Sequence, residues 1–227
     1  MEPTMLIGEE WRHGGTRSTI DVLDKFDGVV IASIPEATTD DVDNAVTAAA
    51  EAFKNNPLTP HQRYTILSES ARLMQVHKEE LARLLVREVG KTIREAHAEV
   101  GSAVAALISA AEEAKRIDGE TVPLDANPGS EKRFAVVMHT PSGPVCAITP
   151  FNAPLNQAAH KVASAIAAGS SIVLKPSEQT PLTAFRLAEI MQEAGLPAGH
   201  LNLVYGRGQP VGQRLLEDKR FARFTFT

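Results

Sequence analysis

Residues 141–156 read Pro-Ser-Gly-Pro-Val-Cys-Ala-Ile-Thr-Pro-Phe-Asn-Ala-Pro-Leu-Asn, and residues 171–178 read Ser-Ile-Val-Leu-Lys-Pro-Ser-Glu. The apolar run Val145–Ile148 lies between turn residues, which predicts a buried strand. Pro154 suits the first position of a helix, and apolar residues then recur every three or four positions until a glycine closes the helix. Ser171–Leu174 predicts a second buried strand. The stretch is a strand–helix–strand unit, and ligands collect at the carboxyl ends of such strands.

Polar residues follow both strands of this unit. Asn152 comes after the first strand, and Lys175 and Glu178 come after the second. Because parallel strands end at the same edge of a sheet, these three residues are placed to touch one ligand. Taken alone, Asn152 is typical of a helix N-cap, and Lys175 with Glu178 is typical of a solvated loop with a surface ion pair.

The composition is that of a globular protein with one large domain or two small ones. Apolar residues make up 43% and charged residues 22% of the 227 residues. The net charge of −5 and the lack of a long basic run give no reason to expect nucleic acid as a partner. No apolar segment is long enough to span a membrane. The single cysteine, Cys146, excludes an internal disulfide and predicts a cytoplasmic location.

Cys146 lies inside the first buried strand, and this position decides its role. A nucleophilic thiolate needs partial exposure and a positive environment, whereas burial raises the pKa of a thiol. The sequence therefore predicts a structural, unreactive Cys146. We expect no metal site in the chain.

The residues before the central unit predict short strands followed by helices. Leu6–Trp11, Ser18–Leu23 and Val29–Ile34 are apolar segments typical of short strands in an N-terminal arm. Capping residues and apolar periodicity then predict helices over about residues 39–53, 60–75, 78–89 and 92–117. Val122–Leu124 and Arg133–His139 flank a Pro-Gly pair, which predicts a β-hairpin or arm.

The pattern of strand and helix repeats after the central unit. We expect Thr180 to be the N-cap of a helix whose first residue is Pro181. Leu201–Val204 predicts a third strand and Phe221–Phe226 a fourth.

A glycine-rich loop and a short helix through Leu216 connect the third and fourth strands. The glycines Gly206, Gly208 and Gly212 have one residue too many for the dinucleotide fingerprint Gly-x-Gly-x-x-Gly. A phosphate loop and a turn that requires positive φ therefore both stay open as explanations.

Two motifs together resemble a known family. Pro150-Phe151-Asn152, with Leu155 and Lys161 after it, and Lys175-Pro176-Ser177-Glu178 resemble the NAD(P)-dependent aldehyde dehydrogenase superfamily. The resemblance runs from about Leu6 to Thr227 and concerns the N-terminal cofactor-binding portion of that family. It implies an α/β fold, a doubly wound Rossmann-like parallel sheet preceded by an N-terminal helical region, with a β-hairpin oligomerisation arm.

The resemblance also implies a domain plan. Residues 1–119 would hold the N-terminal strands and helices of the cofactor-binding domain, residues 120–140 the β-arm, and residues 141–227 an incomplete Rossmann-like NAD(P)-binding core. In the family pattern the chain continues past Thr227 into Gly-Ser and a catalytic domain with the nucleophilic cysteine and the general-base glutamate. We therefore expect this chain to be truncated and inactive by itself. The alternative function is a catalytically inert NAD(P)-binding fragment or binding module.

The implied activity is the oxidation of an aldehyde to its carboxylate with NAD(P) through a cysteine thioester. Asn152 would donate to the oxyanion of the tetrahedral adduct, for which a neutral amide is suited. Lys175 and Glu178 would hold the adenosine ribose. A carboxylate there favours NAD, because a 2′-phosphate would meet like charge, and NADP is the alternative. The implied cofactor-binding residues are Ile148, Thr149, Pro150, Phe151, Lys175, Ser177, Glu178, Gly208 and Gly212.

By the same resemblance, one face of the helix after Asn152 lines the substrate tunnel, although such a face is ordinarily a solvent face. The residues concerned are Ala153, Gln157, His160 and Lys161. A tunnel lined by Gln157 and His160 suits a small polar or anionic aldehyde. The resemblance is closest to the branch that handles lactaldehyde, succinate semialdehyde and phosphono- or sulfoacetaldehyde. The implied partners are this aldehyde and, in the complete protein, further copies in a homodimer or homotetramer, with no nucleic acid and no membrane.

Overall fold

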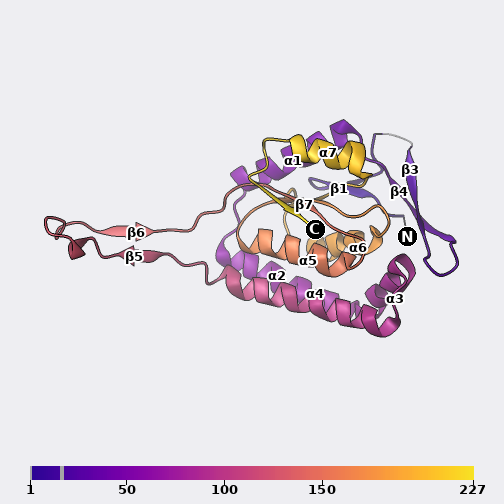
Figure 1. Ribbon diagram of the computed structural model, residues 1–227, viewed down its shortest axis with the longest axis horizontal. Helices are drawn as coiled ribbons and strands as arrows, with labels where there is room; N and C mark the ends of the chain where they lie inside the picture. Colours follow the sequence, from indigo (N-terminus) through magenta and orange to yellow (C-terminus); the bar gives the residue numbers. More distant parts are fainter. Residues whose placement is uncertain (1, 16–17) are drawn as a thin grey trace.

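A mostly parallel sheet lies at the centre of the molecule (Figure 1). The computed structural model describes residues 2–15 and 18–227, and within them the central sheet has six strands in the order β10-β7-β8-β9-β1-β2. The last four strands of the chain run parallel to one another, β1 joins β9 antiparallel, and β2 joins β1 antiparallel. The strands are β1 (Met5–Ile7), β2 (Glu10–Arg12), β7 (Val145–Ile148), β8 (Ile172–Lys175), β9 (Leu201–Leu203) and β10 (Arg223–Phe226).

Helices cover both faces of this sheet. α5 (Pro154–Ala167) and α6 (Leu182–Glu193) pack on one face, and α1 (Thr39–Asn55) packs on the other beside α7 (Gln213–Glu217) (Figure 1). β8 is buried along its whole length, as expected of a central parallel strand with helices above and below. The predicted doubly wound α/β fold is confirmed.

A second layer of helices lies over α5 and α6. It consists of α2 (Pro60–Val76), α3 (Lys78–Val89) and α4 (Ile93–Ala114). The predicted N-terminal signals are confirmed, because Thr38, Thr59 and Thr92 each accept a hydrogen bond from the third residue of their helix in a capping box. Local sequence therefore fixes where α1, α2 and α4 begin.

α4 ends three residues before the predicted end. Its last turn gives way to tighter bonds, in which the Lys115 and Arg116 amides donate to carbonyls three residues back. The chain then passes so close to the arm that a Cβ at Gly119 would lie 2.0 Å from the Val137 carbonyl oxygen. This close approach requires a glycine at position 119.

The N-terminal strands differ from the prediction. The segment Leu6–Trp11 does not form one strand of an arm, because the chain turns at Gly8 with φ +63° and splits into β1 and β2. β1 then joins the central sheet, where Leu6 pairs with Leu203 of β9. Only β3 (Thr19–Leu23) and β4 (Val30–Pro35) form a separate hairpin. The apolar side chains of β1 therefore pack in the main core and not in an arm.

The predicted hairpin after α4 is confirmed. β5 (Glu120–Val122) and β6 (Ala135–Val137) pair antiparallel, with a short 3₁₀ turn, η1 (Leu124–Ala126), between them. This β5–β6 arm extends far from the body of the molecule (Figure 1). Among its apolar side chains, Phe134 is 78% exposed and Met138 is 76% exposed. No helix in the described residues is long and apolar enough to cross a membrane.

Candidate functional site

The carboxyl ends of β10, β7, β8 and β9 meet at one edge of the sheet. The strand register pairs Ile148 with Lys175 on one side and with Phe226 on the other. The Thr149 amide donates to the Lys175 carbonyl at 3.1 Å, which joins the segments after β7 and β8. The loop after β9 reaches the same place, because a Cβ at Gly212 would lie 3.8 Å from Cε of Lys175. Predicted cofactor residues from these loops therefore lie together.

The remaining predicted cofactor residues lie on the open side of the same loops. Phe151 is exposed and Pro150 is half-buried after β7. Ser177 is half-buried after β8, and its hydroxyl accepts the Gln179 amide at 3.2 Å. Gly208 has nothing within 4 Å of where a Cβ would stand. All of them are accessible to a ligand at this edge.

Lys175 and Glu178 form an ion pair whose cation is almost fully buried. Lys175 is 3% exposed, and its Nζ lies 3.8 Å from a carboxylate oxygen of Glu178 and donates to the Pro176 carbonyl at 3.2 Å. Burial lowers the pKa of Lys175, and the carboxylate of Glu178 opposes that shift. This burial argues against the solvated-loop interpretation of the pair, since a surface lysine would leave its charge in water.

The first glycine of the loop after β9 is needed for the turn itself. Gly206 has φ +152°, and a Cβ there would overlap the Val211 side chain at 2.3 Å. The loop continues as an irregular turn, η2 (Gly208–Gly212), before α7. The turn explanation therefore accounts for Gly206, whereas Gly208 is exposed at this edge and Gly212 is buried against Lys175.

Asn152 does not cap α5, so the N-cap alternative is wrong. The N-cap position belongs to Ala153, and α5 has no side-chain cap of its own. The amides of Leu155 and Asn156 donate instead to one carboxylate oxygen of Glu99, at 3.1 and 3.2 Å. Asn152 is exposed, and its side chain has no hydrogen-bond partner in the part of the chain that the structure describes. Its amide is free to donate to a ligand.

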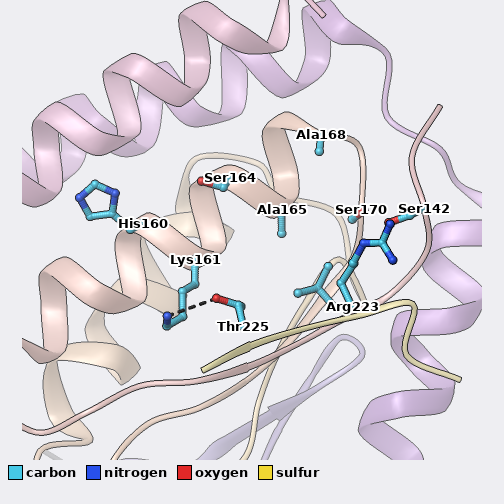
Figure 2. A pocket seen from close by; sticks show the side chains of 10 residues that line it. Ser142, His160, Lys161, Ser164, Ala165, Ala168, Ser170, Arg223 and Thr225 are labelled. Carbon is cyan, nitrogen blue, oxygen red and sulfur yellow. Dashed lines mark hydrogen bonds between the residues drawn. The ribbon is translucent and has the colours of Figure 1, made fainter. Parts of the chain in front are cut away.

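The polar face of α5 meets β10 across a pocket of about 410 Å³ (Figure 2). Lys161 extends from α5 to β10, where its Nζ donates to the hydroxyls of Thr225 at 3.2 Å and Thr227 at 2.6 Å. Burial lowers the pKa of Lys161. His160 lines this pocket and also a second one of about 560 Å³ between α4 and α5.

The predicted tunnel residues thus separate into two groups. His160 and Lys161 line pockets and do not lie on a plain solvent face. Ala153 and Gln157 are half-buried and line neither of these two pockets. The structure also adds Arg223 of β10 to the pocket wall, which the sequence did not indicate.

Cys146 is buried in β7, as predicted. Its side chain is 1% exposed, and burial raises the pKa of its thiol to about 12. At neutral pH the group is therefore a thiol, which is neither accessible nor nucleophilic.

Comparison with known proteins assigns the family. The sequence model described as the aldehyde dehydrogenase family matches residues 11–227. The chain belongs to the aldehyde dehydrogenase family. A 3-sulfolactaldehyde dehydrogenase of Priestia aryabhattai is 47% identical over 223 residues, which are 98% of this chain and 46% of the relative. A mitochondrial succinate-semialdehyde dehydrogenase of Arabidopsis thaliana is 38% identical over 98% of this chain and 42% of the relative.

Solved aldehyde dehydrogenase structures share the fold. An NAD-dependent aldehyde dehydrogenase from Sinorhizobium meliloti superposes with a TM-score of 0.94 at 37% identity, over 100% of this chain and 45% of the other. An NADP-dependent glyceraldehyde-3-phosphate dehydrogenase from Bacillus halodurans, complexed with NADP, superposes with a TM-score of 0.94 at 34% identity. The match covers 100% of this chain and 48% of the other. The chain thus spans about half the length of the curated aldehyde dehydrogenases that it matches.

Two buried acids of this aldehyde dehydrogenase chain were missed by sequence reasoning. Glu99 accepts two first-turn amides of α5, as described above. Glu88 has the equivalent role for α6, because its two carboxylate oxygens accept the amides of Leu182 at 2.8 Å and Thr183 at 3.1 Å, one each. The Thr180 N-cap was therefore a wrong prediction: Pro181 holds that position, and the Thr180 hydroxyl is buried without a partner in the described chain.

A signal for both acids was present in the sequence. Glu88 follows Leu81 and Leu85 at helical spacing, and Glu99 lies between Ala96 and Ala103 on the core-facing stripe of α4. An acid on an apolar stripe is seldom buried without a specific donor. Such a position predicts a buried contact, although it does not identify the partner.

We expect Cys146 to resist thiol reagents in the folded protein. Labelling of native protein should be slow and should become fast after unfolding in denaturant, because only unfolding exposes the thiol. The measurement is the rate of reaction with a chromogenic disulfide reagent, with and without denaturant. Fast labelling of the native protein would show that Cys146 is accessible and would reverse this assignment.

Glu88 should make stability depend on pH. Burial raises its pKa from 4.5 to about 7. Because the folded state holds the proton more tightly, this contribution to stability is present below about pH 4.5 and is lost as the pH rises through about 7. The difference in unfolding free energy between wild type and Glu88→Gln should therefore change by roughly 3 kcal/mol between pH 4.5 and 8, in favour of wild type at low pH.

Urea unfolding at several pH values measures this difference. Glu51, an exposed acid on α1, supplies the control variant Glu51→Gln, whose stability should follow wild type at every pH. Parallel pH profiles for wild type and Glu88→Gln would contradict a raised pKa at Glu88.

Proposed function

We propose that residues 1–227 are the cofactor-binding half of an enzyme that oxidises a small polar or anionic aldehyde to its carboxylate with NAD(P). The observation that carries this proposal is the free amide of Asn152 at the same sheet edge as the pair formed by buried Lys175 and half-buried Glu178. One residue is placed for the reacting oxygen and the other two for the cofactor. Residues 1–119, 120–140 and 141–227 would serve as the helical and strand region, the arm and the cofactor-binding core.

The sheet edge fits a dinucleotide. The Thr149 hydroxyl is buried at the end of β7 and finds no hydrogen-bond partner among the described residues, so a polar ligand would satisfy it. Lys175 and Glu178 offer a donor and an acceptor for ribose hydroxyls, with Ile148, Pro150, Phe151, Ser177, Gly208 and Gly212 around them. NAD(P) would accept the hydride from the substrate. The carboxylate of Glu178 favours NAD, because it would repel the 2′-phosphate of NADP.

Asn152 would stabilise the charge that develops during the reaction. When a thiolate adds to an aldehyde, the carbonyl oxygen becomes an anion, and a donor fixed beforehand lowers the energy of that state. The amide of Asn152 is neutral and carries no competing hydrogen bond within the described chain. The thiolate itself must come from outside residues 1–227, because their single cysteine is the buried Cys146.

The pocket between α5 and β10 supports an anionic substrate. His160, Lys161 and Arg223 bring basic groups to its wall, and Ser142, Ser164 and Thr225 add hydroxyl groups. Relatives named for 3-sulfolactaldehyde and succinate semialdehyde take aldehydes that carry a negative charge. We place the aldehyde carbonyl beside Asn152, with Ala153 and Gln157 next to it and Lys161 and His160 further along α5. Arg223 stands at the amino end of β10, at the sheet edge away from Asn152, so it would act on the substrate only through its charge.

The β5–β6 arm supports assembly with further copies of the chain. Its exposed Phe134, Val136 and Met138 present apolar surface away from the body, as expected of a segment that another subunit covers. We propose a homodimer or homotetramer of the whole enzyme in the cytoplasm, where a reducing environment suits a chain segment with one unpaired cysteine.

Replacing Asn152 tests the oxyanion role. In the whole enzyme that contains residues 1–227, Asn152→Ala should slow the chemical step by ~10²–10³, the usual loss for one oxyanion donor. The measurement is the single-turnover rate of NADH formation at saturating aldehyde and cofactor. Asn44→Ala, at an exposed asparagine of α1 on the other face of the sheet, is the control. An unchanged rate in Asn152→Ala would remove Asn152 from the mechanism.

Replacing Glu178 tests the cofactor site. Glu178→Gln should weaken NAD and improve NADP relative to it, because the substitution removes both an acceptor for the ribose hydroxyls and a charge that repels the 2′-phosphate. The ratio of kcat/KM with the two cofactors measures the change, and Glu193→Gln, at an exposed acid of α6, serves as control. If the ratio stays the same, the loop after β8 does not meet the ribose.

A further inference from the structure

The first turn of α5 takes its hydrogen bonds from another helix. Pro154 has no amide hydrogen, the Leu155 and Asn156 amides donate to Glu99 of α4, and the Gln157 amide donates to the Ala153 carbonyl at 2.9 Å. The amides of the first turn of α5 are thus satisfied without a side chain from the residues that precede the helix. The second carboxylate oxygen of Glu99 is also occupied, because it accepts a hydrogen bond from the ammonium group of Lys91.

The opposite end of α5 is held by a charge of opposite sign. Arg63 of α2 is buried, and its guanidinium donates to the carbonyl of Ala167, the last residue of α5, at 2.6 Å. A carboxylate at the N-terminus and a cation at the C-terminus both complement the helix dipole. Since α2 and α4 supply these groups, the helical layer fixes the position of α5 along its own axis.

We propose that Glu99 is a positioning residue for Asn152. A helix start normally engages a nearby asparagine as its N-cap: the side-chain oxygen accepts first-turn amides, and this contact fixes the direction in which the NH2 donor points. The carboxylate of Glu99 takes over the capping contact, so the Asn152 side chain is not turned toward the start of the helix. It also fixes the first turn of α5, two residues beyond Asn152, against α4. This inference rests on the proposed oxyanion role of Asn152.

A merely structural role for Glu99 is the competing explanation, and the chain contains a matched control for it. Glu88 also accepts two first-turn amides of α6, those of Leu182 and Thr183, with one carboxylate oxygen for each. Glu88 is as buried as Glu99 but serves a helix that does not follow Asn152. Glu99→Gln and Glu88→Gln therefore both remove a buried capping carboxylate, but only Glu99→Gln should affect the oxyanion donor.

A double-mutant cycle in the whole enzyme tests the proposal. The variants are Glu99→Gln, Asn152→Ala and their combination, and the measurement is the single-turnover rate of NADH formation at saturating NAD. Glu99→Gln should slow this rate by about tenfold to 10²-fold, because a donor displaced by a fraction of an ångström to 1 Å loses that much. In the Asn152→Ala background, Glu99→Gln should cause no further loss. The KM for NAD should not change with Glu99→Gln, and Glu88→Gln should leave the single-turnover rate unchanged.

Amide hydrogen exchange gives a readout that does not depend on activity. In Glu99→Gln the Leu155 and Asn156 amides should exchange faster than in wild type, while the Leu182 and Thr183 amides should not change. Glu88→Gln should show the reverse pattern. If Glu99→Gln does not fold, the same cycle with Glu99→Asp decides the matter, because the shorter acid keeps the charge but withdraws the oxygen from the amides.

The outcomes separate this inference from the proposed function. Equal losses from Glu99→Gln in the presence and absence of Asn152 would overturn the positioning role and leave the oxyanion role standing. A Glu99→Gln variant with the wild-type rate would do the same. If Asn152→Ala itself has no effect, the oxyanion role fails first, and the positioning role fails with it.

Discussion

A helix whose first turn is buried must find acceptors for its free amide groups, because water cannot reach them. Both crossover helices of this sheet, α5 and α6, begin under the layer formed by α2, α3 and α4. In each case a carboxylate of that layer accepts two first-turn amides, from Glu99 for α5 and from Glu88 for α6. The position of each crossover is thereby tied to residues far away in the sequence.

This constraint links the fold to the chemistry of the sheet edge. The parallel register brings the segments after β7, β8 and β9 together, which collects the cofactor candidates. The register alone does not decide which way Asn152 faces. In our proposal the carboxylate from α4 sets that direction, so a residue in the helical layer would control a property of a loop in the sheet layer. The carboxyl edge of the parallel sheet thus carries both the exposed amide of Asn152 and the buried ammonium group of Lys175.

The parts of the fold that local sequence could predict are those with local causes. β7 and β8 follow from short apolar runs, and the starts of α1, α2 and α4 were predicted because their capping residues lie within four consecutive residues. The wrong predictions concern residues whose hydrogen-bond partners lie far away in the sequence. The first turn of α6 is capped by Glu88, 94 residues before Leu182, so Thr180 was wrongly predicted as its cap. The first turn of α5 is capped by Glu99, 56 residues before Leu155, so the N-cap alternative for Asn152 was wrong as well. The bond from Lys161 to Thr225 joins residues 64 apart, and no spacing rule reports such a pair.

The β5–β6 arm has a thermodynamic consequence beyond its shape. A two-stranded ribbon is at best marginally stable by itself in water, and this one carries exposed aromatic and thioether groups. In an assembly of the kind proposed here, burial of those groups by a neighbouring copy would provide the free energy that orders the ribbon. Folding of the arm and self-association then form one linked equilibrium, so the protein concentration controls both, and dilution acts on the arm as a denaturant would.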